Sequence, residues 1–271
     1  MKSKYFDSPR PRLFGHRGNS ADYPENTLPA FAAALAEGML YLELDVRATQ
    51  DGEVVVVHDE SLLRTCGVDT AVASLTLDAL QQFDAGATFT TDQGHSFPHR
   101  GLGIKVPTLA EVLRSFPGAL FNIEIKQDTP AMEKATLEVI RQAGMLDRVL
   151  LAAENDAIMA RLRPLCAAHQ VPSSYSFGEL VGFFDWLQKG CQTPYVPPAA
   201  ALQIPEIYEG QTLITPQTIA AAHALNLEIH VWTINETVDM ERLLRMGVDG
   251  VMSDRPGVLR DTAQGIFSDH H

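Results

Sequence analysis

Short apolar runs alternate with amphipathic segments along most of the 271-residue chain. The apolar runs have the length of buried strands, and eight are expected, over residues 12–16, 41–46, 119–126, 149–154, 171–177, 200–205, 228–234 and 249–253. Helical periodicity marks the segments between them, at residues 27–37, 131–143, 157–168, 216–224 and 237–246. This alternation predicts an α/β fold of the (β/α)₈ TIM-barrel type, in which functional residues lie at the carboxyl ends of the strands.

A ninth apolar run covers residues 54–58. The connection that precedes it is too short for the helical crossover that parallel strands need. A two-residue turn at Asp51-Gly52 therefore predicts an antiparallel hairpin in which Asp45 lies opposite His58. Such an arm carries His58 back to the barrel mouth.

The pattern weakens between residues 60 and 106, where loops rich in Gly and Thr surround one expected helix at 75–83. We interpret this stretch as a small inserted subdomain over the barrel mouth, after which a capped helix at 107–113 resumes the barrel. Internal repeats and long linkers are lacking in the sequence, so we expect residues 1–271 to form a single catalytic domain.

Composition narrows the class of protein. The formal net charge of −13, without a basic cluster, makes nucleic acid an improbable partner. Three widely spaced cysteines indicate neither a disulfide framework nor a zinc site. The sequence has no apolar segment typical of a signal peptide or a membrane span, so we expect a soluble cytoplasmic protein without a stable membrane anchor and leave its oligomeric state open.

Carboxylates recur with strand spacing. Glu43 and Asp45 are two residues apart and therefore point to one face of their strand, as Glu124 and Lys126 do on theirs. Ionisable groups are expensive inside such strands unless partners or a metal ion compensate them. Glu43, Asp45 and Glu124 together supply oxygen ligands for one hard divalent cation, Mg²⁺ or Ca²⁺. Lys126 can then meet an anionic ligand, although a structural ion pair with Glu124 is the alternative.

Two imidazoles and a guanidinium complete the candidate chemistry. His16-Arg17-Gly18 precedes the first acidic pair, and His58-Asp59 follows it. Histidines titrate near neutrality and suit proton transfer, while the guanidinium suits an anion. The set fits metal-assisted attack on a phosphate ester.

Ten short motifs in order resemble the glycerophosphodiester phosphodiesterases, a family within the phosphatidylinositol phospholipase C-like phosphodiesterase superfamily. They are Gly15-His16-Arg17-Gly18, Pro24-Glu25-Asn26-Thr27, Glu43-Leu44-Asp45-Val46, Asp51-Gly52, Val57-His58-Asp59, Leu63-Arg64-Thr65, Pro107-Thr108-Leu109, Asn122-Ile123-Glu124-Ile125-Lys126, Val231-Trp232-Thr233-Ile234-Asn235 and Gly247-Val248-Asp249-Gly250. The resemblance spans almost the whole chain. It implies a metal-dependent barrel that hydrolyses glycerophosphodiesters to sn-glycerol 3-phosphate and an alcohol.

The resemblance also implies roles for single residues. The family's metal ligands fall on Glu43, Asp45 and Glu124, and its two catalytic histidines fall on His16 and His58. Its phosphate-contacting cations fall on Arg17 and Lys126. The chain departs from the family pattern at Arg64-Thr65-Cys66 and in residues 249–254, and we expect neither departure to affect the chemistry.

Several alternatives remain open at this point. Gln203 lies near a strand end and can line the site, and Trp232 can border the substrate or belong to the core. The sequence does not decide which histidine is acid and which is base, or whether water or the glycerol 2-hydroxyl attacks first. A lysophospholipid, cleaved as by a phospholipase D, or a sugar phosphodiester is the alternative substrate on the same scaffold.

Overall fold

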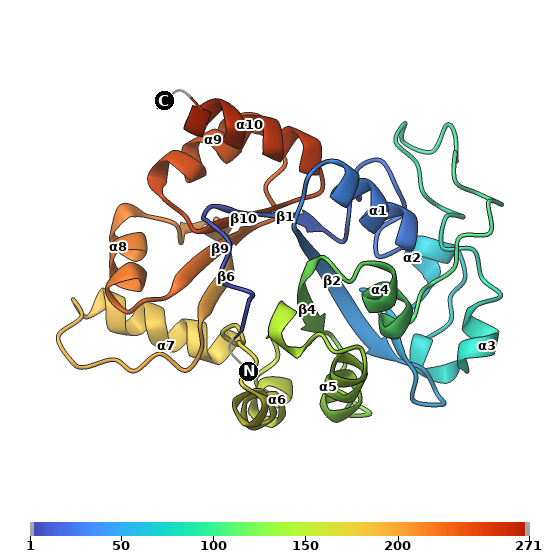
Figure 1. The fold of residues 1–271 in the computed structure, drawn as a ribbon, viewed down its shortest axis with the longest axis horizontal. Helices are drawn as coiled ribbons and strands as arrows, with labels where there is room; N and C mark the ends of the chain where they lie inside the picture. The colour runs from blue at the N-terminus through green and yellow to red at the C-terminus, as the bar shows by residue number, and fades with distance from the viewer. Residues whose placement is uncertain (1–2, 269–271) are drawn as a thin grey trace.

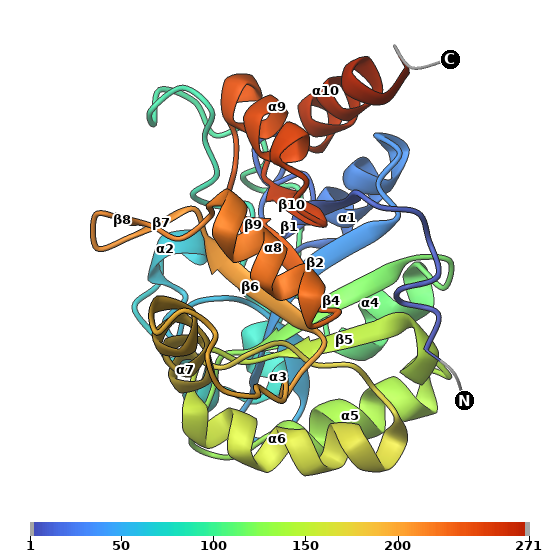
Figure 2. The same cartoon turned by 90° about the vertical axis from the view of Figure 1, so that its left-hand side faces the viewer.

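The parallel strands of the sheet curl around a common axis, and the helices surround them (Figures 1 and 2). The computed structural model describes residues 3–268. The strand order is β5-β4-β2-β1-β10-β9-β6, and β3 pairs with β2 outside this path. These strands are β1 (Arg12–His16), β2 (Tyr41–Ala48), β3 (Val54–Val56), β4 (Leu120–Ile125), β5 (Val149–Ala152), β6 (Ala201–Pro205), β9 (Glu228–Trp232) and β10 (Gly250–Ser253). The predicted TIM-barrel-like α/β fold is confirmed.

The predicted strand over residues 171–177 is wrong in extent. Two isolated parallel bridges stand in its place, joining Ser173 to β5 and Ser174 to β6. Pro172 has no N–H to donate to a ladder, so it contributes only its carbonyl, to Leu151. Phe177 already begins the next helix. The barrel is therefore closed between β5 and β6 by a seam, defined as residues 173–174, with few hydrogen bonds.

Side chains alternate between two environments along each strand. On β2, Tyr41, Glu43 and Asp45 face the barrel interior, while Leu42, Leu44 and Val46 pack against the helices. The barrel interior also contains an apolar cluster, next to these polar groups. Its members are Tyr5, Phe14, Tyr41, Leu120, Leu150, Ala152, Ala201 and Met252.

The hairpin of β2 and β3 forms as expected, but its predicted register is wrong by one residue. Val46 pairs with Val56, so Val57 and not His58 lies opposite Asp45. The cause is a three-residue loop, closed by a hydrogen bond from the Thr49 backbone to Glu53. His58 lies beyond the end of β3, where strand alternation no longer fixes its direction, and it still reaches the site.

The predicted helices are confirmed, with ends that shift by up to two residues in the longer ones. The helices are α1 (Leu28–Ala36), α2 (Leu63–Cys66), α3 (Leu77–Leu80), α4 (Leu109–Ser115), α5 (Glu133–Gln142), α6 (Asp156–His169), α7 (Phe177–Gln188), α8 (Pro216–Ala224), α9 (Thr237–Met246) and α10 (Pro256–Ser268). Thr27 caps α1 with its hydroxyl. The helix predicted at 75–83 is only one turn long, and α2, α7 and α10 were not predicted.

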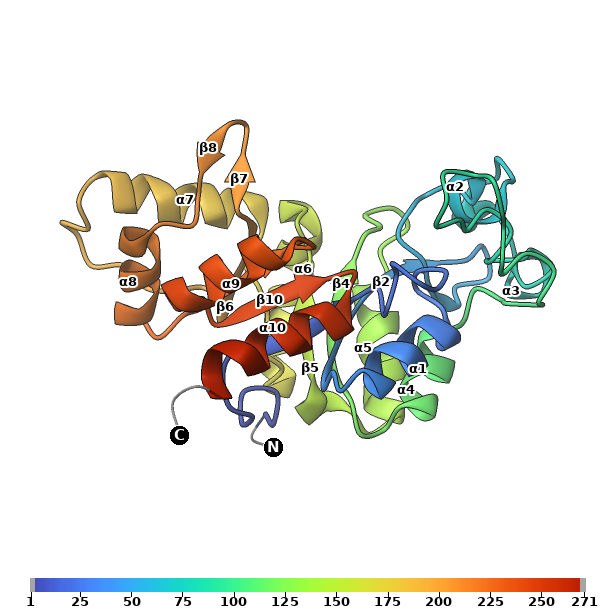
Figure 3. The same ribbon diagram turned by 90° about the horizontal axis from the view of Figure 1, so that it is seen from above.

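Two further segments lie at the carboxyl ends of the strands. Residues 60–106 contain α2 and α3 and have a small apolar core of their own, shared with Val55 and Val57. A short hairpin of β7 (Ile207–Tyr208) and β8 (Gln211–Thr212) projects beyond the helices (Figure 3). The arrowhead of β6, helix α2 and this hairpin lie on the same side of the molecule (Figure 2). Within residues 3–268, no helix is both long enough and apolar enough to cross a membrane.

Candidate active site

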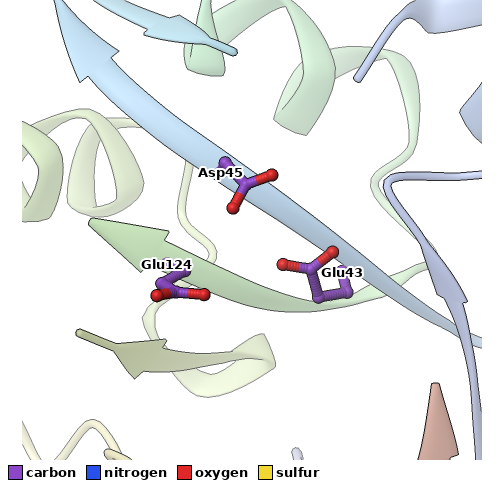
Figure 4. A group of neighbouring side chains, drawn as sticks. All are labelled: Glu43, Asp45 and Glu124. Carbon is purple, nitrogen blue, oxygen red and sulfur yellow. The ribbon is translucent and has the colours of Figure 1, made fainter. Parts of the chain in front are cut away.

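Three carboxylates from neighbouring strands meet inside the barrel (Figure 4). Asp45 and Glu124 pair in register across β2 and β4, and Glu43 lies one inward position before Asp45. Oxygen atoms of the three groups lie within 4.8 Å of one another. Hard divalent cations take such oxygen ligands, so the donor set fits Mg²⁺ or Ca²⁺. The predicted ligand residues are therefore brought together.

Two cations compensate this acidic cluster in part. The Lys126 Nζ lies 2.8 Å from Glu124 and 3.6 Å from Asp45, and the Arg17 Nε lies 3.2 Å from Asp45. Lys126 is thus the ion-pair partner of Glu124, as the structural alternative anticipates. Glu43 has a different environment, because it accepts a hydrogen bond from the Arg17 backbone N–H and has the His16 ring at 3.8 Å.

The pKa values of the three acids separate accordingly. Burial, followed by the charge of Asp45, raises the pKa of Glu43 to about 7. Burial also raises the pKa of Glu124, against the charge of Lys126. Burial acts in the same direction on Asp45, but Arg17 and Lys126 outweigh it and lower its pKa. Negative charge is therefore in excess at Glu43 and Glu124, which a divalent cation would relieve.

A sharp turn after β1 presents Arg17 to the cluster. Arg17 and Gly18 both have positive φ, at 55° and 89°. A Cβ on Gly18 would lie 2.6 Å from the backbone carbon of Ala30, so α1 packs directly on this turn. Asn26 fastens the same loop to the cluster, since its amide donates to Asp45 at 2.9 Å. The turn thus aims the Arg17 backbone N–H at Glu43.

His16 is held from behind by Asp254. The distance between His16 Nδ1 and Asp254 Oδ1 is 2.6 Å, and Ser20 and Asn235 also donate to Asp254. Because an ionised carboxylate only accepts, Nδ1 carries the proton and Nε2 is directed toward Glu43. Burial disfavours the imidazolium, but the bond with Asp254 and the charge of Glu43 outweigh it and raise the pKa of His16.

His58 has the same kind of support from Asp59. Its Nδ1 lies 2.6 Å from Asp59 Oδ1, and Arg47 donates to its backbone carbonyl at 2.8 Å. Burial raises the pKa of Asp59, but bonds from Arg64 and His58 outweigh that effect and bring it to about 2. In both histidines Nδ1 is therefore bonded to a carboxylate, and Nε2 is left for proton transfer.

The two histidines, the three carboxylates of the cluster, Arg17 and Lys126 line one cavity of about 660 Å³. Gln203 and Trp232 line it as well, and Trp232 is 39% exposed, so the core alternative for Trp232 is wrong. The Gln203 amide donates to Asn122 at 2.7 Å, which fixes it between β4 and β6. A mostly apolar wall of the cavity comes from α7, the β7–β8 hairpin and the residue that follows it. Its apolar members are Phe177, Leu180, Val181, Phe184, Tyr208 and Leu213.

Asp254 was not among the predicted site residues, and residues 249–254 were expected not to affect the chemistry, yet Asp254 contacts His16 directly. Its position carries a usable signal. Asp254 directly follows β10, the neighbour of β1 in the barrel, and residues at the carboxyl ends of adjacent strands converge. The residues of β7, β8 and α7 that line the cavity carry no polar sequence pattern that marks them as part of a site.

Comparison with known proteins places the chain in a family. The sequence pattern of the Glycerophosphoryl diester phosphodiesterase family matches residues 16–258. A glycerophosphodiester phosphodiesterase from Caldanaerobacter subterraneus subsp. tengcongensis is 29% identical over 252 residues, which are 91% of this chain and 95% of the relative.

Solved structures agree in fold. A glycerophosphodiester phosphodiesterase from Agrobacterium tumefaciens superposes with a TM-score of 0.73 at 25% identity, covering 96% of this chain and all of the other. An Oleispira antarctica phosphodiesterase, solved with its product sn-glycerol-3-phosphate, superposes with a TM-score of 0.76 at 24% identity, covering 94% of this chain and 97% of the other. The fold is thus that of barrel phosphodiesterases. The chain belongs to the glycerophosphoryl diester phosphodiesterase family and is an enzyme of that kind.

Metal addition tests the acidic cluster directly. A ligand that binds only the folded state stabilises it, by about 2.7 kcal/mol at a concentration of 100 Kd. We expect Mg²⁺ or Ca²⁺ to raise the Tm of the wild-type protein and chelator to reverse the gain, whereas Glu43→Gln, Asp45→Asn and Glu124→Gln lose it. Glu154→Gln is the matched control, because Glu154 lines the same cavity outside the cluster. A wild-type Tm indifferent to metal and chelator would refute the metal site.

The bond between His16 and Asp254 predicts a pH window for stability. Burial acts to raise the pKa of Asp254, but the bond and charge of His16, together with the bonds from Asn235 and Ser20, outweigh it and lower that pKa to about 2. The pKa of His16 is raised. The stabilisation is therefore complete between roughly pH 4 and 6.5. It declines as the pH falls through 2 or rises through the folded pKa of His16.

In chelator, we expect Asp254→Asn to cost about 1–2 kcal/mol of unfolding free energy inside that window. The difference from wild type should shrink above it. Urea denaturation at several pH values measures this. A loss of equal size at every pH would show that Asp254 acts only by packing.

Proposed function

We propose that the protein hydrolyses glycerophosphodiesters to sn-glycerol 3-phosphate and an alcohol with one divalent cation and two histidines. The observation that carries the proposal is the placement of His16 and His58 in one cavity with the Glu43, Asp45 and Glu124 cluster. Family membership supports the reaction class, and the product bound to the Oleispira antarctica relative supports the product. Metal-dependent release of glycerol 3-phosphate from glycerophosphocholine tests it.

The cation would be held by Glu43, Asp45 and Glu124. When bound, it supplies Lewis-acid stabilisation of the phosphoryl oxygens. Arg17 and Lys126 flank these acids and can donate to the same phosphate, which pairs the anionic substrate with local cations in a protein of net charge −13.

The histidines divide the proton transfers. Asp254 and Asp59 fix the two rings through Nδ1, so each Nε2 can give or take a proton at the reacting phosphate. One histidine removes the proton of the nucleophile, and the other protonates the departing alkoxide. The nucleophile is water or the glycerol 2-hydroxyl, and in the second case a cyclic phosphate is opened by water in a later step.

Leaving-group chemistry separates the two histidines. A poor alkoxide needs a proton in the transition state, whereas p-nitrophenolate hardly does. Changing the histidine that acts as acid to Ala should therefore lower kcat/KM for glycerophosphocholine roughly 10²–10⁴-fold, but much less for a p-nitrophenyl diester. Changing the histidine that acts as base to Ala should lower kcat/KM for both substrates. Equal losses for His16→Ala and His58→Ala on both substrates would exclude this division and favour the cyclic route, in which each serves in turn.

The apolar wall favours a second candidate, a lysophospholipid substrate. Phe177, Val181 and Tyr208 line the cavity and yet remain 41%, 54% and 43% exposed. Apolar surface at a binding site is typically covered when the ligand arrives. An acyl chain placed there would bury these side chains, and glycerophosphocholine has none.

Kinetics on substrates with and without an acyl chain distinguish the two candidate substrates. If an acyl chain lies on the wall, Val181→Ser and Phe177→Ser should lower kcat/KM for a lysophosphatidylcholine by roughly tenfold, because each buried methylene contributes up to ~0.8 kcal/mol. Both variants should leave glycerophosphocholine turnover unchanged. Val238→Ser, at a 71% exposed position on α9, is the control. No lysophosphatidylcholine cleavage by the wild type would remove this candidate.

A further inference from the structure

Two of the sequence motifs have no part in the proposed chemistry, yet their side chains meet in space. Arg64 of α2 belongs to one and Glu25 to the other. The Arg64 guanidinium donates to both oxygens of Glu25, at 2.5 and 2.7 Å. Its Nε donates to Asp59 Oδ2 at 2.6 Å. One side chain from the 60–106 segment therefore joins two carboxylates.

Each of these carboxylates holds a side chain that lines the cavity. Asp59 holds His58 through its other oxygen, at 2.6 Å. Glu25 Oε1 accepts from Arg17 Nη1 at 2.9 Å, and Arg17 in turn contacts Asp45. Continuous hydrogen bonds and ion pairs thus connect Arg64 to both sides of the site.

An ordinary exposed ion pair contributes little to the stability of a protein, and the Arg64 side chain is 48% exposed. The geometry here is different, because the guanidinium binds Glu25 through both oxygens and Asp59 through a third donor. The backbone of Arg64 is fixed as well, since the Thr88 hydroxyl lies within hydrogen-bond distance of its carbonyl oxygen, at 2.5 Å. Such a fork fits two carboxylates at once, which a lysine cannot reproduce.

The arrangement also limits how Glu25 can use Arg17. Arg64 occupies both oxygens of Glu25, so Arg17 keeps a single hydrogen bond to one of them. Without Arg64, Glu25 could pair with Arg17 through two parallel bonds and draw the guanidinium away from the phosphate. Asp59 would at the same time lose the donor that fixes its orientation toward His58.

We infer that Arg64 is a positioning residue that sets the His58 ring through Asp59 and keeps Arg17 available for phosphate through Glu25. The inference rests on the proposed roles of His58 and Arg17. It assigns to the 60–106 segment a direct part in ordering the site.

Steady-state kinetics of Arg64→Gln and Arg64→Lys test the inference. We expect Arg64→Gln to lower kcat by about tenfold or more, the size of effect seen when a supporting partner is removed, and to raise KM several-fold. Arg64→Lys should recover only part of either loss. The matched control is Arg141→Gln, because Arg141 binds Glu138 with two similar bonds at 2.7 and 2.6 Å, is 53% exposed, and lies on α5 outside the cavity lining. It should change neither constant by more than twofold.

A double-mutant cycle with Asp59→Asn tests the route to His58. If Arg64 acts on kcat through Asp59, Arg64→Gln should add little to the loss already caused by Asp59→Asn. Additive losses in kcat would overturn that route. Wild-type kcat and KM in Arg64→Gln would overturn the inference as a whole.

Ring ¹⁵N shifts of His58 give a readout that needs no turnover. In the wild type we expect the Nδ1–H tautomer, and in Arg64→Gln a mixture of tautomers, with the Tm of both proteins measured in parallel. An unchanged tautomer in Arg64→Gln would overturn the positioning role of Arg64 at His58. The wild type failing to cleave glycerophosphocholine would instead refute the proposed function, so the two failures are distinguishable.

Discussion

Repulsion among three carboxylates inside the barrel is the constraint on which the rest of the site depends. Glu43, Asp45 and Glu124 lie within 4.8 Å of one another on adjacent strands. Isolated charges at this depth would be prohibitively costly, so each neighbouring element supplies compensation. The turn after β1 brings the Arg17 backbone and side chain, the residue after β4 is Lys126, and the loop before α1 brings Asn26. The cations available to the substrate are thus the same ones that make the cluster tolerable.

Much of this could be predicted from the sequence, because strand alternation acts over short distances. A spacing of two residues placed Glu43 beside Asp45 and Glu124 beside Lys126, and apolar periodicity located seven of the eight expected strands and most of the longer helices. Register depends on finer details. The register of the hairpin differs from the prediction by one residue. Asp51 accepts hydrogen bonds from the Thr49 hydroxyl and from the backbone of α3, and the turn that contains it is one residue longer than predicted. A turn dipeptide alone does not reveal such a partner 26 residues away.

Contacts between residues far apart in the sequence were also not predicted. Asp254 is 238 residues from His16, and only closure of the barrel makes them neighbours. The strand expected at 171–177 failed for a local reason, since Pro172 removes a donor and Ser176 begins the capping box of α7. Apolarity alone did not distinguish that segment from a true strand.

The strand pairing at the seam of residues 173–174 is much shorter than the pairing beneath the acidic cluster. The acidic cluster lies on β2 and β4, which share six register pairs, whereas the apolar wall follows directly from a closure made of two isolated bridges. Local opening is easiest where backbone hydrogen bonds are few. We therefore expect the half of the barrel that holds the acidic cluster to open less readily than the half that holds the apolar wall. A change in the shape of the alcohol would then leave the geometry at the phosphate undisturbed.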